Sequence, residues 1–185
     1  MVDHSTLTDP ELHEPKGAST ATSGQVYAAN GSGSGAWAKP FKYVSVASAY
    51  STGSPYAYSA TTSEAVLNPT TSTITSSQFT VQTSPNFRLR YDGVETLYAK
   101  VYVNASYTHA GGADRDLELA VYKNGSVITN SRVIETSPNN HYTTVTLIYD
   151  ITMATSDYIE IFGKGSASYT ANFVKFYTSI EGHVV

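Results

Sequence analysis

The sequence has no cysteine, one tryptophan and two methionines, and only 14% of its 185 residues are charged. Without cysteine, neither a disulfide framework nor a thiolate metal site can form. No run approaches the roughly 20 apolar residues of a membrane-spanning helix. Residues 1–17 lack the apolar centre of a secretory signal, so we expect synthesis in a cytosol. The net charge of −4 argues against non-specific binding to nucleic acid or an anionic membrane.

Threonine, serine, tyrosine and glycine replace the missing charge, and the 15 tyrosines outnumber the 6 phenylalanines. Threonine, tyrosine and valine favour half-buried strands. From residue 78 onward, strand-like runs alternate with turn signals such as Asp92-Gly93, Gly111-Gly112 and Asn124-Gly125. Asn124-Gly125 is typical of a two-residue hairpin. Short strands at regular spacing, with no window of helical period, predict an all-β antiparallel jelly-roll sandwich over residues 41–185.

Residues 1–40 differ from the rest of the chain because they contain few large aliphatic side chains. Three prolines and the Gly31–Gly35 repeat of glycine and serine disfavour regular structure there. The segment nevertheless carries Tyr27 and the single tryptophan, Trp37. We therefore expect an extended N-terminal arm that becomes ordered only against a partner.

The predicted strands are apolar on both faces. In residues 97–107, Leu97, Val101 and Val103 form an aliphatic face that predicts the core, and Tyr98 and Tyr102 fall on the opposite face. The same division predicts a core face with Val174, Phe176 and Ile180 in the last strand. The opposite faces of four strands then carry one aromatic set: Tyr98, Tyr102, Tyr122, Tyr158, Phe162, Phe173 and Tyr177. A face open to water should be polar, so we expect this set to be buried between copies of the chain. The alternative is a thick sandwich in which inner and outer faces are exchanged on some strands.

Catalytic and metal motifs are weak. His4 and His13 lie among acidic residues without the spacing of a known metal site. Asp114 and Asp116 flank Arg115 in a stretch too short for a calcium loop. No nucleophile elbow or phosphate-binding loop occurs. We therefore expect no enzyme activity, no metal and no cofactor.

Two stretches resemble known proteins. The segments His13–Gly17, Gly24–Gly31 and Gly33–Trp37 resemble an N-terminal element of tailed-bacteriophage virion proteins that sits on the head or fibre surface. Residues 117–128 and 143–166 are similar to strands of the complement-like and tumour-necrosis-factor-like jelly roll, a trimeric β-sandwich. Together, the resemblances imply a phage capsid decoration (cement) protein or head fibre on the virion surface.

On that resemblance, residues 1–40 would bind the major capsid protein, with His13, Glu14, Pro15, Tyr27 and Trp37 as contacts, and residues 41–185 would form a homotrimer that stabilises the head. Tyr27 and Trp37 would insert into a groove on the capsid or under the jelly roll of a neighbouring copy. One alternative is a fibre or spike tip whose surface tyrosines stack on host glycans. A further alternative is a polysaccharide depolymerase that uses Asp150, Asp157 or Glu160.

Overall fold

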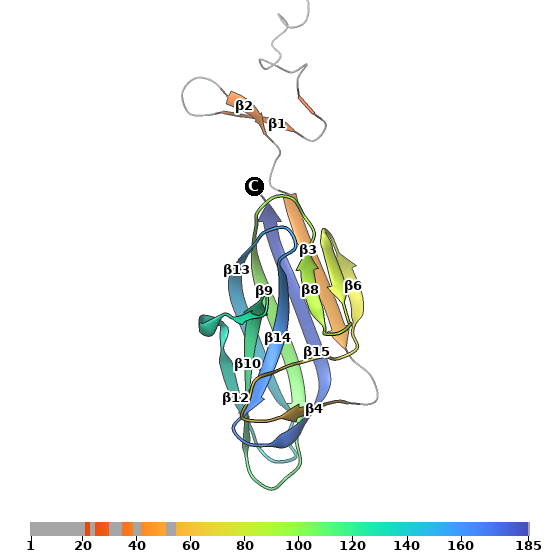
Figure 1. The fold of residues 1–185 in the computed structure, drawn as a ribbon, viewed down its shortest axis with the longest axis vertical. Helices are drawn as coiled ribbons and strands as arrows, with labels where there is room; N and C mark the ends of the chain where they lie inside the picture. Colours follow the sequence, from red (N-terminus) through yellow and green to blue (C-terminus); the bar gives the residue numbers. More distant parts are fainter. Residues whose placement is uncertain (1–20, 23–24, 30–34, 39–41, 51–54, 185) are drawn as a thin grey trace, which may run out of the picture. The chain divides into compact units, whose positions relative to one another are not determined.

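The computed structural model describes residues 21–22, 25–29, 35–38, 42–50 and 55–184. The chain divides into two units, Met1–Lys42 with Val185 and Tyr43–Val184. Among the described residues there is no α-helix, and therefore none that could cross a membrane. The predicted all-β, antiparallel sandwich is confirmed (Figure 1).

The first unit contains a two-stranded antiparallel hairpin. Strand β1 (Val26–Ala29) pairs with β2 (Gly35–Ala38), so that Tyr27 lies directly opposite Trp37. The expectation of an arm without regular structure is therefore wrong for these residues. The missed signal is a pair of short runs of small and aromatic residues, Val26–Ala29 and Gly35–Ala38, separated by five residues that include glycine.

The second unit is a sandwich of two sheets. The first sheet has the order β11-β10-β14-β8-β7, with β12 beside β10 and β5 beside β14. Its strands are β5 (Ala65–Val66), β7 (Phe79–Gln82), β8 (Arg88–Tyr91), β10 (Arg115–Lys123), β11 (Ser126–Val127), β12 (Val133–Ser137) and β14 (Tyr158–Gly165). The 3₁₀ turn η3 (Thr129–Ser131) precedes β12. Asn124 and Gly125 join β10 to β11 with φ values of 52° and 78°, as the hairpin signal predicts.

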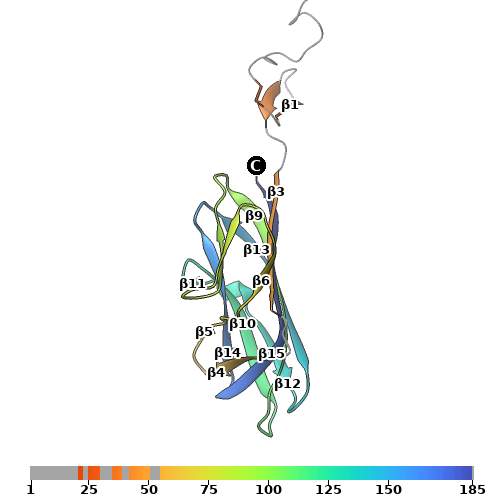
Figure 2. The ribbon, with the colours of Figure 1, turned by 90° about the vertical axis from the view of Figure 1, so that its right-hand side faces the viewer.

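The second sheet has the order β13-β9-β15-β3-β6, with β4 beside β15. Its strands are β3 (Lys42–Tyr50), β4 (Tyr56–Ala60), β6 (Ser72–Ser76), β9 (Leu97–Thr108), β13 (Thr143–Met153) and β15 (Tyr169–Val184). Figure 2 shows the sandwich edge-on, with β3 and β15 in one layer and β11, β10 and β14 in the other. We call the solvent side of the second sheet its outer face.

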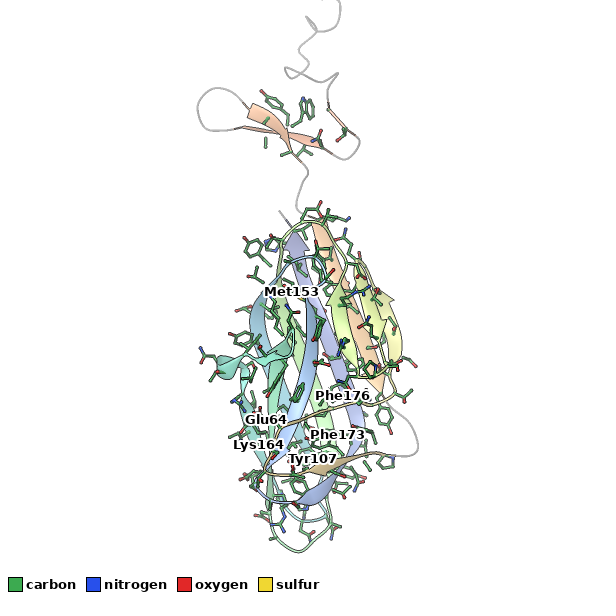
Figure 3. All side chains as sticks on the ribbon, viewed as in Figure 1. Glu64, Tyr107, Met153, Lys164, Phe173 and Phe176 are labelled. Carbon is green, nitrogen blue, oxygen red and sulfur yellow. The ribbon has the colours of Figure 1, made fainter. Side chains whose placement is uncertain are left out.

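The core lies between the sheets and follows the predicted alternation along most strands. Leu97, Val101 and Val103 on β9 are fully buried, as are Leu117 and Leu119 on β10. Successive side chains of a strand point to opposite faces of the sheet, so every second residue of each strand lies in the interior. Figure 3 shows Met153 toward one end of this core and the rings of Tyr107, Phe173 and Phe176 toward the other.

Strand β15 departs from the prediction. Between Phe173 and Lys175 its register with β9 shifts by one residue, which marks a β-bulge. The bulge places both Phe173 and Phe176 in the core, fully buried, and leaves Val174 only partly buried. The prediction that Phe173 lies on the outer face and Val174 in the core is therefore wrong.

Candidate functional site: a tyrosine-bearing sheet face

Four strands of the second sheet bring distant residues into rows on its outer face. The register across β13, β9 and β15 aligns Thr152 with Tyr98 and His183. The next rows hold Asp150, Lys100 and Glu181, then Ile148, Tyr102 and Ser179, and then Thr146, Asn104 and Tyr177. Tyr43 on β3 joins the face because its hydroxyl donates a hydrogen bond to Glu181 Oε2 at 3.1 Å. We call this set the tyrosine face.

Two of the four tyrosines on this face are open to solvent, and the other two, Tyr102 and Tyr177, are partly buried. Tyr43 is 63% exposed, Ile148 is 56% exposed and Tyr98 is 50% exposed. The Tyr98 ring stacks on the His183 imidazole with centroids 6.1 Å apart and planes 24° apart. Partial burial raises the pKa of Tyr43, and the hydrogen bond to Glu181 raises it further. The tyrosine face is therefore an aromatic surface that the chain itself leaves partly uncovered.

Charged groups on the tyrosine face are balanced. Lys100 Nζ forms an ion pair with Asp150, a carboxylate that is 82% exposed. The hydrogen bond to Asp150 raises the pKa of Lys100. Glu181 adds a negative charge, and Lys175 adds a positive one in the next row, which also holds Ser106 and Thr144 and which we include in the tyrosine face. Two cations and two anions give the face no net charge, so an identical face can approach it without overall repulsion.

Two hollows indent the tyrosine face. One, of about 440 Å³, lies around Tyr98, Lys100, Asp150 and His183. The other, of about 320 Å³, lies between Tyr102, Asn104, Thr146 and Tyr177. Hollows beside exposed rings on one sheet can receive side chains from another molecule, which is the geometry of an interface core.

The aromatic rings on the outer side of the first sheet have partners within the chain. Tyr122 stacks on Phe162 with ring centroids 3.7 Å apart, and its hydroxyl donates to Glu64. Arg132 forms ion pairs with Glu64 and Glu118. Figure 3 shows Glu64 and Lys164 together in this region.

These contacts also shift the pKa values of Glu64 and Tyr122. The hydrogen bond from Arg132, and then that from Tyr122, hold the pKa of Glu64 below its ordinary value. Burial, followed by the bond to Glu64, raises the pKa of Tyr122 to about 12. The guanidinium of Arg88 lies 4.2 Å above the Tyr158 ring and pairs with Glu160 at 2.9 Å. The aromatic rings of this sheet therefore already have partners.

The seven aromatic residues predicted to form one patch fall into three places. Tyr98, Tyr102 and Tyr177 lie on the tyrosine face, but Tyr122, Tyr158 and Phe162 lie on the outer side of the opposite sheet. Phe173 is in the core. The prediction of a single patch is wrong because alternation along a strand does not reveal which strands share a sheet. The sequence interpretation also missed Tyr43, Ile148 and His183 on the tyrosine face.

The hairpin carries the two aromatic residues predicted for the arm. Tyr27 and Trp37 pack edge to face with centroids 5.5 Å apart. A Cβ on Gly35 would lie 2.7 Å from Tyr27 Cε1, so the Tyr27 ring crosses the strand where only glycine leaves room. His13, Glu14 and Pro15 lie outside the described residues.

The three carboxylates considered for catalysis do not converge. Asp150 belongs to the tyrosine face, whereas Asp157 and Glu160 belong to the first sheet or the turn before it. Asp157 accepts hydrogen bonds from Lys123 and Asn124, and Glu160 is buried against Arg88. Within the described ranges, no three His, Cys, Asp or Glu side chains are grouped so as to hold a metal ion.

Solved structures match the fold, and they include tumour necrosis factor family members. The chain is similar to the tumour necrosis factor Eiger of S. frugiperda, at 9% identity, over 78% of this chain and 93% of that one, with a TM-score of 0.51. Murine APRIL is 9% identical over 76% of this chain and 99% of that one, with a TM-score of 0.50. The PRD1 vertex protein P5 is 11% identical over 77% of this chain and 97% of that one, with a TM-score of 0.49. No protein-family model and no curated protein sequence matches the chain. The predicted jelly roll is thereby confirmed.

Proposed function

We propose that the chain is a structural protein of a bacteriophage virion, a homotrimeric decoration subunit that attaches to the capsid through residues 1–40 and stabilises the head. The observation that carries the self-association step is the tyrosine face. It is aromatic, hollowed and uncharged overall, and Tyr43 and Tyr98 are half or more exposed, whereas Tyr122 on the opposite sheet is stacked on Phe162. An antiparallel sheet that faced only water would be polar on that side.

The partner on the tyrosine face is a second and third copy of the chain. Tyrosine combines a large rigid apolar ring with a hydroxyl that tolerates partial wetting, which suits a protein interface. The balanced charges permit identical faces to meet. Three copies agree with the trimeric jelly rolls that the sequence resembles, and the same fold is found here.

The place on a virion is supported by the sequence resemblance of residues 13–37 to a phage virion element. Attachment through three arms on one trimer gains from multivalency, because the second and third arms bind at high effective concentration. Clamping neighbouring capsid subunits in this way would resist expansion of the head.

Light scattering on the full chain tests the trimer, since three copies of 19.9 kDa are required. Two exposed isoleucines supply a matched pair of variants. Ile148 is 56% exposed on the tyrosine face and Ile134 is 59% exposed on β12 of the other sheet. We expect Ile148→Lys to dissociate the trimer and Ile134→Lys to leave it intact. A monomeric wild-type chain, or dissociation by Ile134→Lys alone, contradicts the proposed interface.

Attachment is tested separately with phage heads of the parent virus that lack the protein. A chain shortened to residues 41–185 should remain trimeric and no longer sediment with these heads, whereas the full chain should. Binding of the shortened chain at full affinity would show that residues 1–40 are not the attachment segment.

The hollow at Tyr98 favours carbohydrate binding as a second candidate function. An exposed ring beside Lys100 and Asp150 offers a stacking platform next to polar hydrogen-bonding groups. A glycan array probed with the wild type and Tyr98→Ala separates the candidates. Glycan binding that Tyr98→Ala abolishes, by a chain that is monomeric in solution, would favour this function over the trimer.

A further inference from the structure

The hairpin is a small unit with one aromatic face. Tyr27 and Trp37 form a directly opposed pair on that face, and Gln25 Nε2 donates to the Trp37 carbonyl at 3.4 Å. Val26, Ala28 and Ala36 occupy the other face and are exposed. The aromatic pair is therefore held in place before any partner binds.

The described contacts do not satisfy this face. A two-stranded hairpin is at best marginally stable in water, so it gains stability only if its apolar face is covered. The Trp37 Nε1 atom is shielded from solvent, yet it has no hydrogen-bond acceptor among the described residues. A shielded donor without an acceptor is uncommon in native proteins, so hydrogen bonding alone does not favour this arrangement of the indole.

Identical hairpins suit one another as partners that cover this face. Residues 25–38 contain no charged side chain, so copies related by symmetry bring no like charges together. Only four residues separate Ala38 from Tyr43, which limits the chain between them to at most about 18 Å. Tyr43 belongs to the tyrosine face. Chains joined through that face would therefore hold their hairpins at high local concentration.

We propose that the three hairpins of one trimer pack their Tyr27–Trp37 faces against one another and form a shared aromatic hub. This inference rests on the proposed trimer. It assigns Tyr27 and Trp37 to contacts between copies, and it leaves contact with the capsid to the residues that precede Gln25.

Trp37 is the only tryptophan of the chain, so fluorescence excited at a wavelength that tyrosine does not absorb reports on the hub alone. In the full-length trimer we expect weak quenching by acrylamide. Dilution until light scattering shows monomers should raise the quenching constant several-fold, and so should the dissociating variant Ile148→Lys. Tyr27→Thr should raise it in the intact trimer, whereas Val26→Thr, on the opposite face of the same strand, should not.

The outcomes separate this inference from the proposed function. A wild-type chain that is monomeric in solution contradicts both the proposed trimer and the aromatic hub. A trimer whose Trp37 is as readily quenched as that of the dissociated chain overturns the hub and leaves the trimer standing. Protection of Trp37 that appears only when the trimer binds phage heads also overturns the hub, because the capsid would then be the partner. Equal protection in monomer and trimer shows that the chain itself shields Trp37, and it overturns the hub too.

Discussion

Truncation of Phe173 to alanine distinguishes a core residue from an interface residue. The ring is fully buried and meets the rings of Tyr56, Tyr58, Tyr107 and Phe176, with centroids 5.7–6.3 Å apart. Burial of phenylalanine in a core is worth about 3–5 kcal/mol on truncation to alanine. Because four ring contacts are lost together, we expect the upper half of that range.

Urea unfolding followed by circular dichroism measures this effect. With a slope of about 2 kcal/mol per molar urea, a loss of about 4 kcal/mol lowers the midpoint by about 2 M. The loss should be the same at all protein concentrations, because it belongs to the subunit. Tyr98→Ala, on the tyrosine face, should instead lower the midpoint by an amount that depends on protein concentration. If Phe173→Ala lowered the free energy of unfolding by less than about 1 kcal/mol, and by an amount that depends on protein concentration, Phe173 would be an interface residue and the β-bulge would be refuted.

Three further predictions concern the first sheet. Arg88→Met leaves the buried Glu160 carboxylate without its cation and should lower the free energy of unfolding by about 3–5 kcal/mol. In urea titrations, the double variant Arg88→Met with Glu160→Gln should be more stable than Arg88→Met alone. Gly163→Ala would place a methyl 2.7 Å from a neighbouring leucine methyl and should cost about 1–3 kcal/mol in thermal melts. Arg132 lowers the pKa of Glu64 from 4.5, so Glu64 stabilises the fold above that pH and loses this contribution as the pH falls through its lowered pKa. The stability deficit of Glu64→Gln near neutral pH should therefore shrink on acidification, and a deficit that stays constant would contradict the ion pair.

The sequence predicted the fold well where local rules decide it. Strand β9 begins at Leu97 and ends at Thr108, as the alternation predicts, and the Asn124-Gly125 turn joins β10 to β11. These features depend on neighbouring residues alone. The bulge at Phe173 depends on pairing with β9, which is distant in sequence, and no residue type near it announces the shift.

The candidate site was less predictable because it depends on sheet membership. Tyr98 and Tyr122 follow the same local pattern, an aromatic residue opposite an aliphatic one, yet they lie on different sheets. Tyr43 entered no prediction because its strand alternates only weakly. Its place on the tyrosine face follows from β3 lying beside β15, which is a long-range pairing.

The two outer faces show what separates an interface from a finished surface. Both carry aromatic rings, but on the first sheet the Tyr122 ring is stacked on Phe162 and its hydroxyl is bound to Glu64. On the second sheet, Tyr43 and Tyr98 keep half or more of their surface exposed, and Tyr98 lines a hollow of about 440 Å³. The sequence composition does not distinguish the rings of the two faces, whereas their burial and their contacts within the chain do. The expected partner therefore meets the second sheet, and substitutions of matched exposure on the two sheets should differ in assembly and not in folding.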